Sequence, residues 1–233
     1  MTNPRSPATL PPEPVRGESA TTTISLTPGP RGRGVLSPLI PALIFGVLTV
    51  GTLIIGSQAF DTGQGGLLTL LATVLVVSAI PLAIFAAVAY QLLRALGAGG
   101  PLPLVGFSGG VLAAAALSTS AALTWAAAQS EGLGLTDTAL TKVLTEASFA
   151  AGGAGFDSSV GLLIAGVAGP ALLGRLLPRA VAWTGLVIAM LSMLSALSLL
   201  IPVLNYLIPV GRFGGMLWII AAAALLRRNQ RQS

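Results

Sequence analysis

One short segment carries a pattern that serine hydrolases use. Residues 106–110 read Gly-Phe-Ser-Gly-Gly, which matches the G-x-S-x-G sequence around a nucleophilic serine. Such a serine needs a base to accept its proton, and the chain contains no His. Its single Lys, Lys142, falls in a segment that the topology derived below places across a membrane from Ser108. Because Gly106 and Gly110 also form a G-x-x-x-G pair, which lets helices approach closely in lipid, we predict helix packing here rather than catalysis.

The residue types that bind metals and cofactors are scarce. Cys and His are both absent, which removes disulfides, thiol nucleophiles, imidazole acid–base catalysis and the commonest metal ligand. No phosphate-binding loop, zinc motif, haem motif or nucleotide fingerprint occurs in the chain. We therefore expect no enzymatic activity and no cofactor. The net charge of +5 does not predict a nucleic-acid partner, because its distribution follows membrane topology.

Asp157 and Arg212 are the charges best placed to form a binding site. Both are predicted at the outer ends of apolar spans, each beside Gly-rich backbone. They could be interfacial charges that end their helices, or they could line a vestibule for a polar ligand. If the fourth span began near Ala147, Asp157 would be half-buried and would need a partner, for which Arg212 is best placed. We hypothesise an external ion pair, which a charge swap at both positions should restore after each single swap disrupts it.

Small residues recur at helix-packing spacing elsewhere in the chain. Gly161, Ala165 and Gly169 follow one another at steps of four along one span, and Gly211 and Gly215 do so at the start of another. Small side chains at this spacing let two backbones approach closely in lipid. We predict that these positions are helix contacts, either within the chain or with another copy or membrane protein.

Three serines place hydroxyl groups along one side of a further span. Ser192, Ser195 and Ser198 are three residues apart, and interhelical serine hydrogen bonds contribute roughly 0.6–2 kcal/mol each in a bilayer. The alternative is a polar path for a small neutral solute. Because no Asn, Gln or charged residue shares their depth, we predict packing.

Six apolar stretches without any charged residue or His must position these groups. About 20 apolar residues let a helix cross a hydrocarbon core of roughly 30 Å, and a charge at its centre costs about 2.5–3.5 kcal/mol. Charged residues make up 8% of the chain and hydrophobic ones 54%, against roughly a quarter charged in soluble domains. We predict an all-α, polytopic transmembrane helical bundle over residues 35–227. Its six spans cover about 36–57, 67–93, 104–129, 158–174, 180–203 and 213–226.

The loop between the third and fourth spans contains a short amphipathic pattern. Leu140, Val143, Leu144 and Ala147 share one face at helical spacing. We therefore predict an external amphipathic helix over about 137–150, lying on the membrane surface or packed over the bundle.

Both ends of the chain are polar, and the basic residues predict the orientation. Residues 1–34 form a Pro- and Arg-rich tail that is predicted to be disordered, and residues 228–233 form a basic tail. Ten of the 12 Lys and Arg residues fall in one set of alternating segments, and only Lys142 and Arg212 fall in the other. Under the positive-inside rule, this distribution predicts both termini in the cytoplasm and a multi-pass protein of the cell membrane.

The C-terminal third of the chain resembles a known group of membrane proteins. Residues 152–156 read Gly-Gly-Ala-Gly-Phe, residues 176–185 read Leu-Leu-Pro-Arg-Ala-Val-Ala-Trp-Thr-Gly, and residues 211–215 read Gly-Arg-Phe-Gly-Gly. These segments resemble a group of uncharacterised six-span integral membrane proteins from actinobacteria, which is similar to a broad bacterial membrane family of unknown function. The resemblance implies the six-span layout and assigns no activity, ligand or catalytic residue.

Two functional hypotheses of different classes follow from these observations. The first is a non-enzymatic accessory or interaction protein, embedded in the lipid bilayer, whose small-residue faces bind another copy or another membrane protein. The second is a transporter or channel for a small neutral or amphiphilic solute, with a path lined by Ser and Thr. Because the spans are free of charge and show no clear internal repeat, the sequence favours the first hypothesis.

Overall fold

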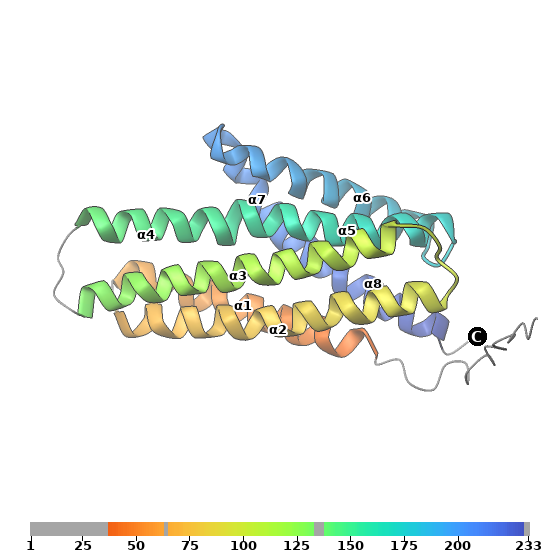
Figure 1. Cartoon of the computed structure of the whole chain (residues 1–233), viewed down its shortest axis with the longest axis horizontal. Coiled ribbons are helices and arrows are strands. Elements are labelled where there is room, and N and C mark those ends of the chain that lie inside the picture. The colour runs from red at the N-terminus through yellow and green to blue at the C-terminus, as the bar shows by residue number, and fades with distance from the viewer. Residues whose placement is uncertain (1–36, 63–64, 133–137, 231–233) are drawn as a thin grey trace, which may run out of the picture. The chain divides into compact units, whose positions relative to one another are not determined.

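The computed structural model describes residues 37–62, 65–132 and 138–230, which belong to the compact unit of residues 34–233. The described residues form helices and turns, without a strand (Figure 1). The predicted N-terminal tail of residues 1–34 lies outside the described residues. The elements in chain order are α1 (Leu39–Thr62), α2 (Gly65–Ala95), α3 (Leu102–Gly132), α4 (Thr138–Ala150), η1 (Ala151–Gly155), α5 (Phe156–Leu173), α6 (Arg179–Leu194), η2 (Ser195–Leu199), η3 (Pro202–Tyr206), α7 (Leu207–Pro209), η4 (Val210–Gly214) and α8 (Gly215–Gln230).

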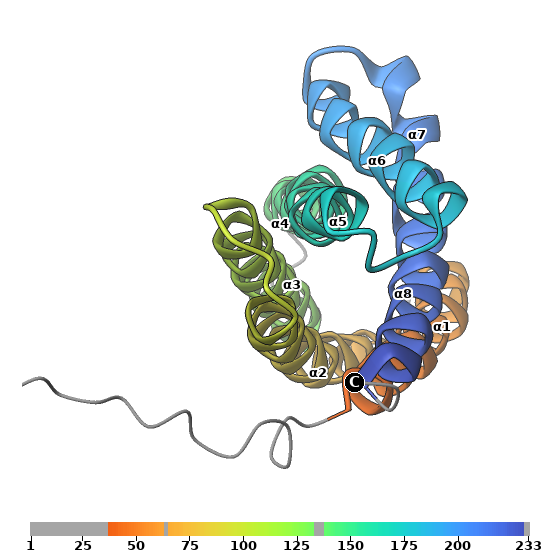
Figure 2. The ribbon, with the colours of Figure 1, turned by 90° about the vertical axis from the view of Figure 1, so that its right-hand side faces the viewer.

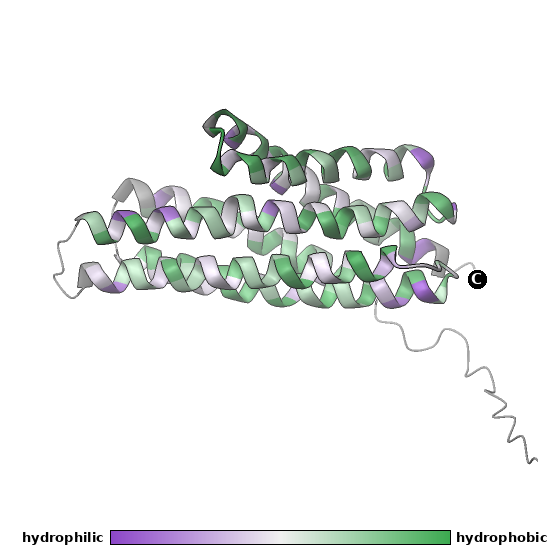
Figure 3. Cartoon of the chain, turned by 45° about the horizontal axis from the view of Figure 1, so that its top comes forward, coloured by the Kyte–Doolittle hydropathy of each residue, from purple (hydrophilic) through white to green (hydrophobic). Residues whose placement is uncertain are grey.

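Six of the described helical segments are long and apolar enough to cross a membrane, as the sequence predicts. Large apolar side chains such as Val47, Ile80 and Leu217 are more than half exposed, and Figure 3 shows hydrophobic residues along most of each long helix. Lipid, rather than water, is the medium in which such surfaces are stable. The segments are Leu39–Ala59, Gly65–Ala95, Leu102–Ser130, Ala139–Leu173, Arg179–Leu199 and Val203–Arg228.

Neighbouring helices in the chain are also neighbours in space. Helix α2 packs between α1 and α3, α3 packs against α5, and α5 packs against α6. Helix α8 then returns to contact α1, as the view along the helices shows (Figure 2). The buried core between them includes Phe85, Leu117, Phe156, Leu163 and Ile219.

The fourth span differs from the prediction, because the expected external helix is part of it. Helices α4, η1 and α5 continue one another in a single rod, so the rod begins at Thr138 instead of Ser158 (Figure 1). A π-helical turn accommodates the glycines of residues 152–155 without ending the helix. In lipid, no water is present to satisfy the backbone groups that a loop would expose, so a Gly-rich segment stays helical. The helix predicted over 137–150 forms as α4, Thr138–Ala150, but it continues into the fourth span instead of being separate from it.

The last span also begins earlier than predicted. Short helical turns from Pro202 onward lead directly into η4 and α8, so Arg212 lies within the apolar segment Val203–Arg228. Both predicted external charges are therefore inside segments that are long and apolar enough to cross a membrane. A charge in an apolar segment needs a partner of opposite charge or a proton, so the surroundings of these two side chains are central to the site.

Candidate functional site

Glycines bring the backbones of α3 and α5 into contact. A Cβ atom added to Gly166 would overlap the backbone of Gly106 and would lie 2.8 Å from the carbonyl oxygen of Leu102. One turn further along α3, a Cβ on Gly110 would overlap the Cβ of Ala86 in α2. The Gly-Phe-Ser-Gly-Gly segment thus supplies the close approach of three helices. We call the contact of Gly106, Gly110 and Gly166 the glycine seam.

The other predicted packing positions lie at further helix contacts. A Cβ on Gly161 would stand 2.8 Å from the carbonyl oxygen of Ala189 in α6, and one on Gly215 would stand 3.2 Å from a side chain of α5. A Cβ on Gly169 would make an ordinary contact of 3.4 Å with a side chain at the start of α3. Ala165 is half-buried against the core. The sequence analysis did not single out Gly166, although it lies between Gly161 and Gly169.

Two π-helical turns meet at the centre of the described helices. A nitrogen of Arg212, in η4, donates a hydrogen bond of 3.3 Å to the carbonyl oxygen of Gly152, in η1. π-Helical turns are rare and occur frequently at functional sites, because the extra residue frees backbone groups and redirects side chains. We call this meeting point of η1, η4 and the start of α5 the π junction.

Asp157 is fully buried at the π junction, with no exposed surface. Within the described residues, neither carboxylate oxygen has a hydrogen-bond partner, and the same holds for the hydroxyl oxygen of Ser192. An oxygen of Asp157 and the Ser192 hydroxyl each lie 2.6 Å from the point where a Cβ on Gly211 would stand. Gly211 therefore makes room for two unpartnered oxygens. A buried carboxylate in this state is costly unless it holds a proton or is matched by a positive charge.

The nearest such charge belongs to Arg212. Its guanidinium lies 5.2 Å from the centre of the Phe156 ring, a distance typical of cation–π contact, and it interacts electrostatically with Asp157. No hydrogen bond joins the two side chains, since both Asp157 oxygens lack a partner in the described part of the chain. The structure thus brings the two predicted residues together inside the membrane-crossing segments, but it does not form the predicted external pair.

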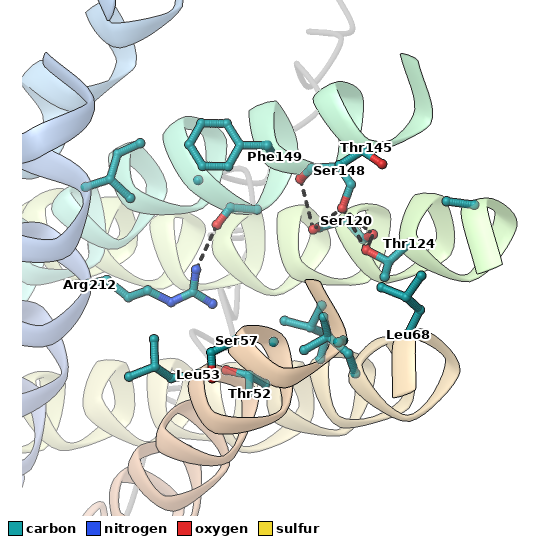
Figure 4. A pocket seen from close by; sticks show the side chains of 18 of the residues that line it. Thr52, Leu53, Ser57, Leu68, Ser120, Thr124, Thr145, Ser148, Phe149 and Arg212 are labelled. Atoms are coloured by element: carbon teal, nitrogen blue, oxygen red, sulfur yellow. Dashed lines mark hydrogen bonds between the residues drawn. The ribbon is translucent and has the colours of Figure 1, made fainter. Parts of the chain in front are cut away.

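A cavity of about 810 Å³ opens beside the π junction, between α1, α2, α3 and the α4–η1 rod. Arg212 extends into it from η4, into the space between Ser57 of α1 and Phe149 of α4 (Figure 4). The wall is mainly apolar, and hydroxyl groups are set into it. Those of α1 are Thr49, Thr52 and Ser57, those of α3 are Ser120 and Thr124, and those of α4 are Thr141, Thr145 and Ser148.

Part of this wall is an interhelical hydroxyl cluster that joins α3 to α4. The hydroxyl of Ser148 lies 2.8 Å from that of Thr124 and 3.0 Å from that of Ser120 (Figure 4). Each of Ser120 and Ser148 also donates to the other's carbonyl oxygen. The sequence analysis missed this cluster, because Ser148 was assigned to a surface helix. It pointed instead to the α6–η2 serines, where Ser195 bonds the carbonyl of Ser192 in its own helix.

The apolar face of α4 is not packed over the bundle, which was one of the two predicted arrangements. Leu140 and Val143 are 43% and 64% exposed, whereas Thr141, Thr145 and Ser148 line the cavity. The apolar face therefore points outward, as it should in lipid, and the polar face points to the cavity. The orientation of α4 therefore brings hydroxyl groups to an otherwise apolar wall.

The side chains that line this cavity can bind a solute. Ser108 is exposed and does not line the cavity. Among the described residues, no group of three or more acidic side chains is placed to hold a metal ion. The cavity offers hydroxyl donors and acceptors, the guanidinium of Arg212, the carboxylate of Glu146 and an extensive apolar surface.

Comparison with known proteins identifies no relative of this chain. No family model, curated protein or solved structure matches this chain.

Proposed function

We propose that the protein binds a small amphiphilic solute in this cavity and carries it across the cell membrane. The observation that supports the proposal is the cavity itself, since its volume of about 810 Å³ lies within the roughly 300–1,000 Å³ of small-molecule sites. Such sites are mostly apolar with a few polar groups that orient the ligand. The geometry therefore favours the second of the two hypotheses from sequence over an accessory protein.

The interrupted helices beside the cavity support carriage as well as binding. Transporters commonly place their solute near the middle of the membrane, where discontinuous helices free backbone groups and allow movement. Here η1 interrupts the fourth span, and η2, η3 and η4 interrupt the segments that follow. Each interruption lies at or beside the π junction or in the connection between the last two spans.

The orientation that we propose places both termini in the cytoplasm. Arg94 closes α2, Arg175 and Arg179 lie at the α5–α6 turn, and two further Arg residues lie in the last turn of α8. Lys142 lies near the opposite end of the bundle, in the first turns of α4. This asymmetry supports the positive-inside assignment.

Thiol labelling tests the proposal cleanly, because the chain has no native Cys. Thr52→Cys and Thr124→Cys place a thiol on the cavity wall, and Ser118→Cys on the exposed face of α3 is the matched control. In proteoliposomes, a membrane-impermeant maleimide should label the two cavity thiols at least tenfold faster than the control. Equal protection of all three thiols would exclude a water-accessible cavity and would favour the accessory protein.

A further inference from the structure

We propose that the solute is an amphiphilic anion, whose headgroup binds the guanidinium of Arg212 while Asp157 takes up the proton that balances its charge. This inference rests on the proposed function and specifies the substrate class of the same cavity. It combines three observations of the π junction: a cation that reaches the cavity, a carboxylate that does not, and the absence of a hydrogen bond between them.

The guanidinium of Arg212 is available to a ligand. It has five N–H donors, and the described residues supply one hydrogen bond, to the carbonyl oxygen of Gly152. The rest of the group faces the cavity, among hydroxyl and apolar side chains (Figure 4). A guanidinium binds carboxylate, phosphate and sulfonate groups through paired N–H donors. The large apolar surface beside it fits the hydrocarbon part of an amphiphile.

Asp157 does not border the space that a ligand would occupy. It is completely buried, it does not belong to the cavity wall, and its oxygens approach Gly211 and Ser192 instead. A ligand can therefore reach Arg212 without touching Asp157. The two negative groups, one on the ligand and one on the protein, would then share a single positive charge.

Charge balance in the membrane links binding to a proton. Before binding, the guanidinium and the carboxylate sum to zero charge. An added monoanion would leave one uncompensated negative charge in a medium of low dielectric constant, where electrostatic energies are several-fold larger than in water. If Asp157 gains one proton from solution as the anion binds, the sum is again zero. No covalent bond between ligand and protein forms.

Asp157 is the one charged side chain of the described residues that is fully buried. Arg212 acts on Asp157 from η4, and α6 faces it with the Ser192 hydroxyl. Tyr90 of α2 packs on Phe107 instead. The described parts of η1 and η2 carry no titratable side chain, and α3 carries one, Glu131, next to its last residue. In α4, Lys142 and Glu146 are exposed, and Glu146 belongs to the cavity wall. The Arg residues of α2 and α8 lie in the last turns of those helices. Proton uptake at the junction is therefore assigned to Asp157.

Three probes with the same alkyl chain test the anion assignment. Purified protein in nanodiscs is dialysed against labelled 1-octanesulfonate, 1-octanol or octyltrimethylammonium, and binding to empty nanodiscs is subtracted. We expect the sulfonate to bind at least tenfold more tightly than the ammonium. Arg212→Gln should weaken sulfonate binding at least tenfold and leave octanol binding unchanged. Lys142→Gln, which removes an exposed cation outside the cavity wall, is the control and should change neither.

The outcomes separate this inference from the proposed function. If the three probes bind equally, or if the sulfonate fails to bind while the cavity thiols are labelled, the anion assignment is rejected and a solute cavity still stands. If the cavity thiols are protected as well, both proposals fail. The comparison of probes on the unmodified protein decides the question even where Arg212→Gln does not fold.

The proton assignment has its own readout. Because 1-octanesulfonate stays ionised across the range, any pH dependence of its binding belongs to the protein. Uptake of one proton predicts that its Kd falls by up to about tenfold for each unit by which the pH is lowered. Asp157→Asn, which mimics the protonated group, should bind tightly and without this slope, whereas Lys142→Gln, outside the cavity wall, should keep it. A flat profile in the unmodified protein, or the same slope in Asp157→Asn, would overturn the assignment.

Discussion

The glycine seam and the π junction use the same kind of residue for opposite purposes. At the seam, Gly106 and Gly166 remove side chains so that two backbones touch, and the surroundings are apolar. At the junction, Gly211 removes a side chain so that the unpartnered oxygens of Asp157 and Ser192 fit beside the backbone. The first arrangement gains packing energy, and the second accommodates a group that is costly to bury.

The comparison shows what a small-residue spacing in a membrane helix can and cannot reveal. Gly106 and Gly110 form one such pair, and Gly211 and Gly215 form another with the same step. The first pair approaches backbone and apolar side-chain atoms of neighbouring helices. In the second pair, Gly211 approaches the carboxylate of Asp157. The spacing predicts that a neighbouring group packs closely against the glycines, but it does not distinguish a backbone from a polar side chain.

Substitution of Gly166 by Ala should give the largest effect, because the obstacle at the seam is backbone. The new methyl group would overlap Gly106 and approach the Leu102 carbonyl, so that α3 and α5 must separate. Overpacking of this kind costs roughly 3 kcal/mol, measured as the loss of unfolding free energy in an SDS titration. Gly51→Ala is the matched control, because nothing lies within 4 Å of its Cβ position. Equal effects of the two substitutions would refute the seam as a close backbone contact.

Gly211→Ala should have a smaller effect that a second substitution can relieve. Its methyl group would stand 2.6 Å from an oxygen of Asp157 and from the hydroxyl of Ser192. These obstacles are side-chain atoms, so we expect a cost of about 2 kcal/mol. In the double variant with Ser192→Ala, roughly half of this loss should be recovered. A strictly additive double-mutant cycle would show that the junction is packed in some other way.

The sequence predicts the membrane-crossing helices well because their signal is simple. Residues 36–57, 67–93 and 104–129 are long, apolar and free of charge, and the observed segments Leu39–Ala59, Gly65–Ala95 and Leu102–Ser130 agree within a few residues. A helix is the one conformation in which such a run satisfies its own backbone hydrogen bonds in lipid.

The first half of the fourth span could not be predicted in the same way. Thr141, Thr145, Glu146 and Ser148 lower its hydropathy to that of a surface helix, but all four line the cavity. A polar face that turns toward an internal space has the same periodicity as one that turns toward water. This single error moved Asp157 from a buried position to a predicted helix end, and it separated Ser148 from its partners on α3.

The interhelical hydroxyl cluster offers the smallest and most specific test of whether the polar face of α4 points toward the cavity. Ser148→Ala removes the bonds to Thr124 and Ser120, and hydrogen bonds between membrane helices contribute about 1 kcal/mol. We expect that loss in the SDS titration, whereas Ser118→Ala, which bonds only within its own helix, should change stability by about half as much or less. Because Ser148 belongs to the wall, its loss should also alter maleimide labelling at Thr124→Cys. If α4 instead lay on the surface, neither effect would be seen, because Ser148 would be hydrogen-bonded to water and not to α3.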